Sequence, residues 1–157
     1  MLGNANRNRT GEAFITHVKG VLVATPRIKV ALSRIDESKW EKKGTRSFLV
    51  YRDLGAVDAT EGRFNAHVAR AIHAKDSTTN APLHFHTLGF HLTYVLRGWM
   101  RTYYEGIGEI VLKAGDCVTY EGEVPQSHTE HSEDFEVLQV TMPAEFPTVD
   151  IDKKQEG

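Results

Sequence analysis

Histidines are the residues of this chain whose types and spacing point most directly to chemistry. Eight are present, and five of them fall between His84 and His131. Imidazole binds Zn, Cu, Fe and Ni through one ring nitrogen, while the other nitrogen forms a hydrogen bond to a supporting group. The pattern predicts one divalent transition metal per chain (Fe, Zn or Ni), held by His84, His86, His91 and His128.

Strand geometry explains how these side chains would meet. Successive side chains of a strand point to opposite faces, so His84 and His86 share one face and Phe85 takes the other. His91 begins the next strand, and His128 follows 37 residues later in a segment that a closed barrel can bring back beside the first. A His-x-His pair alone is more typical of two surface histidines, so the further histidines and the glycine turns around them carry the metal prediction.

Charge narrows the kind of substrate. If four neutral histidines are the only protein ligands, a divalent ion keeps its full positive charge. Such an ion is a strong Lewis acid and attracts a small anionic or metal-chelating organic substrate.

Three residues are candidates for a substrate pocket beside the metal: His67, Thr93 and Tyr120. His67 shares one face of its expected strand with His73 and can reach the lumen, although a surface or hydrogen-bonded role is the more typical interpretation. Thr93 lies on the same face as His91. Tyr120 is assigned neither to the lumen nor to the outside, and no catalytic residue is assigned.

Two other residues are weighed and set aside. His131 competes with His128 as the last ligand, but it lies in the polar run 129–134, which resembles a hairpin turn. Cys117 follows a Gly-Asp turn at the start of a strand, so we expect a small buried residue there.

Short strands must position these side chains. From Phe48 onward, segments rich in β-branched and aromatic residues alternate with glycine-containing turns, a pattern typical of an antiparallel barrel or sandwich. Helical periodicity is nearly absent, and 36–44 is expected to be a loop with room for one helical turn. The clearest strands are expected at Arg63–His73, Leu92–Arg97, Trp99–Tyr104, Ile110–Leu112, Cys117–Tyr120 and Phe135–Met142.

The chain divides into one barrel and its flanking segments. Residues 1–10 are polar and expected to be flexible. Residues 11–60 contain upstream strands near 18–24, 28–35 and 47–51, which pack on the barrel or swap with a second subunit. The barrel is expected at 61–146, and 147–157 is expected to be a C-terminal tail.

Size and charge limit the classes of function. The chain has 157 residues, which suits one domain, and carries 19 Lys and Arg against 21 Asp and Glu. The charges are balanced, so neither nucleic acid nor a membrane surface is expected as a partner. A single cysteine, the lack of an apolar signal segment and the lack of an apolar run of membrane-spanning length predict a cytoplasmic protein.

The motifs resemble those of the cupin superfamily, which read G-x5-H-x-H-x(3,4)-E-x6-G and G-x5-P-x-G-x2-H-x3-N. His84, His86 and Gly98 match the first motif, and Gly115 and His128 match the two ends of the second. For a bacterial single-domain cupin, the resemblance implies an all-β jelly-roll barrel with the metal inside its mouth. It also implies a homodimer.

Several positions depart from the family pattern. His91 stands where the family has its glutamate, so it is either a ligand or a neighbour of the site, and the identity of the metal depends on it. Glu123 and Pro125 stand at the places of the second motif's proline and glycine. Ser132 replaces its asparagine.

Three functions follow from the resemblance. A metal-dependent dioxygenase, in which iron binds substrate and O2 at open positions, is favoured. The alternative enzyme is a non-redox Lewis-acid isomerase, cyclase or lyase with Zn or Ni, and cupin-type polyketide cyclases offer a precedent with four histidines. The third interpretation is a non-catalytic cupin that binds a small ligand. The bound metal would distinguish them.

Overall fold

The computed structural model describes residues 29–43, 48–74 and 82–151, together with the backbone of 15–18 and 21–24. The chain divides into two compact units, Met1–Val30 and Ala31–Gly157. In the first unit, β1 (Ile15–Val18) pairs antiparallel with β2 (Val21–Ala24), so a hairpin replaces the single strand expected near 18–24. The segment expected to be flexible, 1–10, lies outside the described residues.

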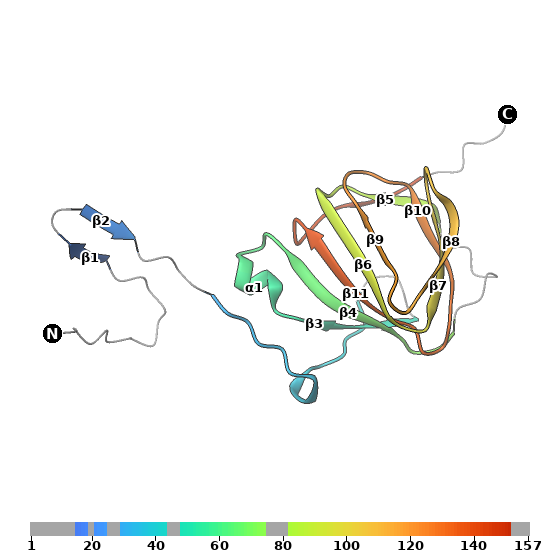
Figure 1. Ribbon diagram of the computed structural model, residues 1–157, viewed down its shortest axis with the longest axis horizontal. Coiled ribbons are helices and arrows are strands. Elements are labelled where there is room, and N and C mark those ends of the chain that lie inside the picture. The colour runs from blue at the N-terminus through green and yellow to red at the C-terminus, as the bar shows by residue number, and fades with distance from the viewer. Residues whose placement is uncertain (1–14, 19–20, 25–28, 44–47, 75–81, 152–157) are drawn as a thin grey trace. The chain divides into compact units, whose positions relative to one another are not determined.

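The second unit is built from strands that form two antiparallel sheets (Figure 1). Its strands are β3 (Leu49–Asp53), β4 (Asn65–Ala71), β5 (His84–His86), β6 (Phe90–Arg97), β7 (Trp99–Tyr104), β8 (Gly108–Lys113), β9 (Cys117–Tyr120), β10 (Gln126–His131), β11 (Glu136–Met142) and β12 (Thr148–Asp150). One sheet has the order β12–β5–β10–β7–β8 and the other β3–β4–β11–β6–β9. Many neighbours in these sheets are distant in sequence, as in a jelly roll. The fold is an all-β jelly-roll barrel, as the sequence predicts.

Two short helical segments join the strands. The 3-10 turn η1 (Ile35–Glu37) lies at the start of the loop for which one helical turn was expected. The helix α1 (Ala56–Thr60) was not expected. It is only five residues long, which is too short to show a helical period in the sequence.

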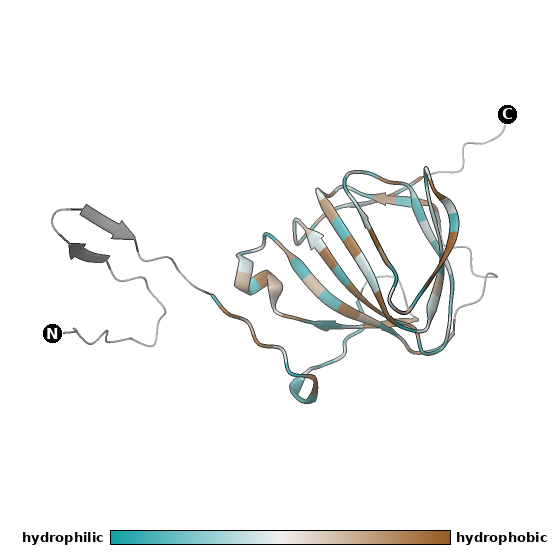
Figure 2. Cartoon of the chain, viewed as in Figure 1, coloured by the Kyte–Doolittle hydropathy of each residue, from teal (hydrophilic) through white to brown (hydrophobic). Residues whose placement is uncertain are grey.

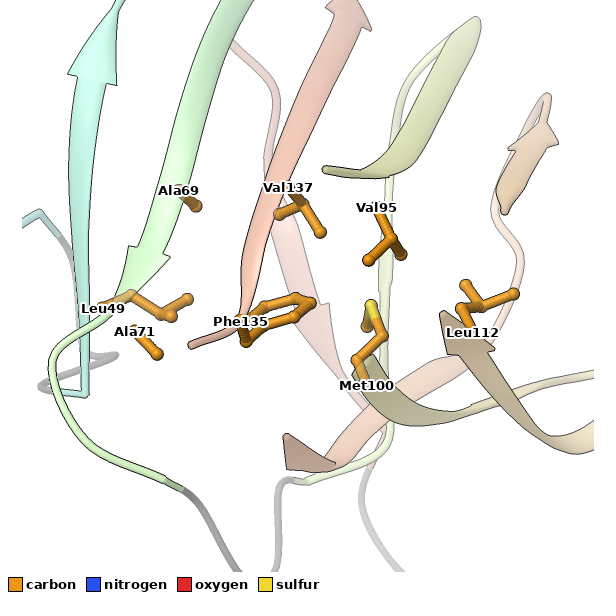
Figure 3. Close-up of a cluster of buried hydrophobic side chains, with 8 residues drawn as sticks. All are labelled: Leu49, Ala69, Ala71, Val95, Met100, Leu112, Phe135 and Val137. Carbon is orange, nitrogen blue, oxygen red and sulfur yellow. The ribbon is translucent and has the colours of Figure 1, made fainter. Parts of the chain in front are cut away.

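The apolar core lies between the two sheets. Figure 2 shows hydrophobic and hydrophilic positions interleaved along the barrel strands, which is the alternation that half-buried strands require. Figure 3 shows the buried hydrophobic cluster, contributed by β3, β4, β6, β7, β8, β11 and the residue before β11: Leu49, Ala69, Ala71, Val95, Met100, Leu112, Phe135 and Val137.

The inner face changes from apolar to polar along three neighbouring strands. Two residues from Ala69, Val137 and Val95, the inward positions are His67 on β4, Gln139 on β11 and Thr93 on β6. Gln139 is the direct cross-strand partner of both His67 and Thr93. The core therefore occupies one end of the barrel, and the other end is lined by polar side chains.

Three expectations about the borders of the barrel need correction. Strand β3 pairs with β4, so the barrel sheet begins before residue 61, and described residues 29–34 form no strand. The expected tail 147–157 contributes β12, which pairs with β5. All three residues of β12 are exposed, so its sequence carries no burial pattern, and pairing with the sheet edge is what orders it.

Cys117 is exposed rather than buried. In β9 the half-buried positions are Val118 and Tyr120, so alternation turns Cys117 to the outside. Among the described residues, no helix is long and apolar enough to cross a membrane.

Candidate metal centre

Three of the predicted ligands lie together at the polar end of the barrel. His84 and His86 form the two ends of β5, and His91 is the second residue of β6. All three are buried. The ring centroids of His84 and His86 are 5.0 Å apart, and those of His86 and His91 are 6.0 Å apart. The structure therefore brings together the residues that strand alternation and the turn after β5 predicted to converge.

Each of these rings uses its Nδ1 atom for a hydrogen bond to a supporting group. His84 Nδ1 lies 2.9 Å from the carbonyl oxygen of Pro82, and His86 Nδ1 lies 2.9 Å from the hydroxyl oxygen of Thr148 on β12. His91 Nδ1 contacts the hydroxyl group of Tyr120 on the neighbouring strand β9. In metal sites this supporting contact belongs to the ring nitrogen that does not bind the ion.

Two of these contacts set the protonation of the ring. A carbonyl oxygen only accepts, so His84 donates from Nδ1 and its Nε2 carries a lone pair. The amide nitrogen of Gln139 approaches His91 Nε2 at 3.4 Å, so His91 Nε2 also presents a lone pair and its Nδ1 donates to Tyr120. Imidazole binds metals in this form, with an outer hydrogen bond fixing the ring.

Gln139 links this cluster to two of the predicted pocket residues. Its Nε2 donates to Thr93 Oγ1 at 3.2 Å, and its Oε1 lies 3.1 Å from His67 Nε2. The ring of His67 also packs edge-on against Tyr51, with centroids 5.3 Å apart. His67 and Thr93 therefore lie in one hydrogen-bond network with His91.

Tyr120, the third predicted pocket residue, lies between His91 and Gln126. The hydroxyl oxygen of Tyr120 accepts a hydrogen bond from Gln126 Nε2 at 2.7 Å. Gln126 is buried and is the cross-strand partner of His84 in the pairing of β10 with β5. The structure thus places an amide side chain opposite the first histidine of the pair.

His128 lies two residues further along β10 and has a different set of contacts. Its Nε2 donates to the carbonyl oxygen of Glu130 at 3.1 Å and lies 3.2 Å from His131 Nδ1. Its ring packs against His131, Phe135 and Phe48. Nε2 of His128 therefore carries a proton. It also lies against the neighbouring buried ring of His131.

Comparison with known proteins gives likeness in structure and none in sequence. No family model and no curated protein matches the chain. The polyketide cyclase RemF from Streptomyces resistomycificus matches with a TM-score of 0.57 and 20% identity over 78% of this chain and 86% of RemF. A RmlC-like cupin from Shewanella frigidimarina matches with a TM-score of 0.52 and 16% identity over 72% of this chain and 90% of that protein. FeII HppE matches with a TM-score of 0.52 and 20% identity over 83% of this chain and 64% of HppE.

This chain has a cupin fold. The jelly-roll barrel and its motif-bearing strands agree with the resemblance seen in the sequence, and the cupin structures it resembles include an enzyme. At these identities the likeness concerns the fold alone.

The histidine position of the second cupin motif falls on a different residue from the one predicted. Counted forward from Gly115 with the family spacing, the histidine position falls on Gln126, and His128 lies two residues beyond it. The strand pairing agrees, because Gln126 is the residue opposite His84. Ligation by His128 stays a prediction, and in this structure it requires the ring to leave His131.

The reason for setting His131 aside was wrong. Strand β10 continues through His131, which is 1% exposed and packs against Phe135. A β-bulge between His128 and Glu130 shifts the register, so that both His128 and His131 turn inward. A polar run with no regular alternation resembles a turn, which is why the sequence was misleading here.

The side chains His84, His86, His91 and Gln126 are of types that bind a divalent transition metal. His84, His86 and His91 would hold it through Nε2, and Gln126 is the additional polar side chain opposite His84. Within the described residues, however, no three or more His, Cys, Asp or Glu side chains are arranged so that they could hold an ion. Binding therefore requires these rings to rotate toward one point, and His91 Nε2 to give up its contact with Gln139.

Sequence reasoning missed Gln126, Gln139 and Thr148. The family spacing counted from Gly115 could have found Gln126. Gln139 carried a weaker signal, since it is a polar residue between Val137 and Thr141 on the inward face of β11. Arg101 lies on the outer face, where hydrogen bonds to Glu130 and then Glu109 raise the pKa of its guanidinium group.

Proposed function

We propose that this chain is a metal-dependent cupin enzyme acting on a small anionic or metal-chelating organic substrate. His84, His86 and His91 would be its metal ligands. The observation that carries the proposal is the orientation of the three buried rings, whose Nδ1 atoms each contact a supporting group, as the outer nitrogen of a metal-binding histidine does. Three histidines on strand surfaces without a common role would not share this arrangement.

The neutral ligands favour a non-redox reaction. A bound divalent ion would supply Lewis-acid polarisation of a substrate carbonyl or hydroxyl group. Among the described residues, the buried polar side chains are all His, Thr or Gln. The two-histidine, one-carboxylate set that is diagnostic of many iron oxygenases therefore has no carboxylate here. Isomerisation, cyclisation or elimination is the reaction class that this pocket supports best, and the likeness to a polyketide cyclase is in keeping with it.

Tyr120 and His67 are the residues best placed to hold or move a proton. The Tyr120 oxygen receives hydrogen bonds from His91 Nδ1 and Gln126 Nε2, which place its hydroxyl group next to a candidate metal ligand. His67 is half-buried and is held by Gln139. Both side chains would lie beside a substrate at His91.

A dioxygenase is the second candidate. Its support is that imidazole also suits iron, and that the fold is shared with FeII HppE.

Oxygen uptake separates the two chemistries. Protein purified without chelators is analysed for metal and then assayed with catechols, diketones and thiols in an oxygen electrode. We expect zinc or nickel and substrate conversion that proceeds unchanged without O2. Iron together with O2 consumption matching product formation would instead establish the dioxygenase. Metal without turnover of any compound would leave a ligand-binding protein.

The affinity for the metal should also decrease as the pH is lowered. Free imidazoles take up protons around pH 6.5, and a protonated ring cannot bind an ion. Affinity unchanged between about pH 5 and 8 would contradict ligation by histidine.

A further inference from the structure

Thr141 carries a buried hydroxyl group that has no hydrogen-bond partner among the described residues. The residue is 2% exposed and lies directly opposite His91 in the pairing of β11 with β6. A buried polar atom without a partner destabilises the folded protein, because it has lost its hydrogen bonds to water. Such a hydroxyl beside a candidate metal ligand is explained if its partner arrives with a bound compound.

Gln139 lies two residues before Thr141 on the same face of β11. Its contact with His91 Nε2, at 3.4 Å, is the longest of its three and occupies the atom that a metal needs. Gln139 would give up this contact if His91 held an ion. Its bonds to Thr93 and His67 would then keep its amide group next to His91.

We infer that Gln139 and Thr141 form a substrate subsite of the barrel. They would bind an oxygen atom of a small organic compound while a neighbouring oxygen of that compound binds the metal at His91. The inference rests on the proposed function, because it requires a metal on His91. It adds the residues that select the substrate.

The chemistry of the subsite defines the class of compound. The Gln139 amide donates to a carbonyl or carboxylate oxygen, and the Thr141 hydroxyl both donates and accepts. The described buried polar residues are all uncharged His, Thr or Gln, so the charge of an anionic substrate would be balanced by the ion alone. Compounds with two adjacent oxygen groups fit best, such as 2-hydroxy acids or 1,2-dicarbonyl compounds.

Lactate binding to the Co(II)-loaded protein tests the inference. Calorimetry gives the affinity, and the visible absorption of Co(II) reports whether lactate reaches the metal. We expect Gln139→Leu to raise the Kd for lactate about tenfold, as the loss of one hydrogen bond predicts. Gln139→Glu should weaken lactate binding further, because it keeps an oxygen for His67 but places a negative charge beside the anion. Affinity for Co(II) should stay the same or rise in Gln139→Leu, since the competing contact is gone.

Thr141→Val provides an independent measurement and should raise the lactate Kd several-fold. Thr119→Val is its matched control, since Thr119 is exposed on β9, and it should change nothing. Equal lactate affinity in wild type, Gln139→Leu and Thr141→Val would overturn the inference while leaving the metal site intact. If circular dichroism shows that Gln139→Leu does not fold, Thr141→Val decides alone. Failure of the wild type to bind Co(II) would overturn the proposed function and this inference with it.

Discussion

The buried histidines of this barrel differ in which ring nitrogen forms their structural hydrogen bonds. His84, His86 and His91 use Nδ1 for structural bonds, whereas His128 uses Nε2, which donates to the carbonyl oxygen of Glu130 and lies 3.2 Å from His131 Nδ1. In metal sites, a hydrogen bond at one ring nitrogen orients the histidine while the other nitrogen binds the ion. His128 instead resembles a residue that stabilises the packing around Phe48 and Phe135.

Substitution of His128 and Gln126 separates these two roles. We expect His128→Ala to lower the free energy of unfolding by about 2 kcal/mol, because it removes buried hydrogen bonds and ring packing. It should leave metal affinity within a few-fold of wild type. Gln126→Ala should do the reverse: it should lower the affinity for the metal with little loss of stability. Urea denaturation and metal titration measure both. Loss of the metal in His128→Ala with retention in Gln126→Ala would restore His128 as the ligand.

The sequence allowed the three clustered histidines to be predicted, but not their partners. Alternation along one strand and a short turn are local features, and they suffice to place His84, His86 and His91. The roles of Gln126 and Gln139 depend on cross-strand register, and two additional residues between Gly115 and His128 shifted that register. An amide or a hydroxyl also has many ordinary uses in a strand, so its type alone carries little information.

At the scale of elements, the edge strand β12 supports the site. It pairs with β5 and supplies the Thr148 hydroxyl to His86 Nδ1. Strands β7 and β9 could be predicted to the residue, because turn signals bound their β-rich segments. Neither β12 nor α1 could be, since each is short and is ordered by contacts with the rest of the barrel.

Thr148→Val tests the supporting role of β12. The substitution keeps the shape of the side chain and removes the hydroxyl that orients His86. Loss of such an outer hydrogen bond lowers metal affinity about 10- to 100-fold in known sites, and we expect a change in this range with the barrel still folded. Thr148→Ser restores the hydroxyl and should recover most of the affinity, measured by competition with a chelating dye. Equal affinity in all three proteins would remove β12 from the site.

At the scale of the whole molecule, the barrel separates stability from chemistry. The apolar cluster fills one end, and the polar network around His91 lines the other, so substitutions in the network should spare the fold. The sequence predicted this jelly-roll architecture through its regular short strands and turns. It misplaced the C-terminal border of the barrel because β12 pairs with β5, a segment distant in sequence.

The homodimer expected from the cupin resemblance stays a prediction with some support on the surface. Leu32 and Ile35 are 74% and 59% exposed in the segment before β3, and a partner subunit could cover these apolar side chains. We expect light scattering to give twice the mass of the chain. The double variant Leu32→Asp, Ile35→Asp should give the monomer mass. A monomeric wild type would contradict the expectation.

Metal content of the purified protein tests the central claim most directly. Elemental analysis of protein prepared without chelators, or reloaded and desalted, should find about one divalent transition metal per chain. His86→Ala should lose that metal while its circular dichroism spectrum stays that of the barrel. His73→Ala, which changes an exposed histidine, should keep it. A wild-type protein that neither carries nor takes up metal, or a His86→Ala variant with full occupancy, would contradict the account.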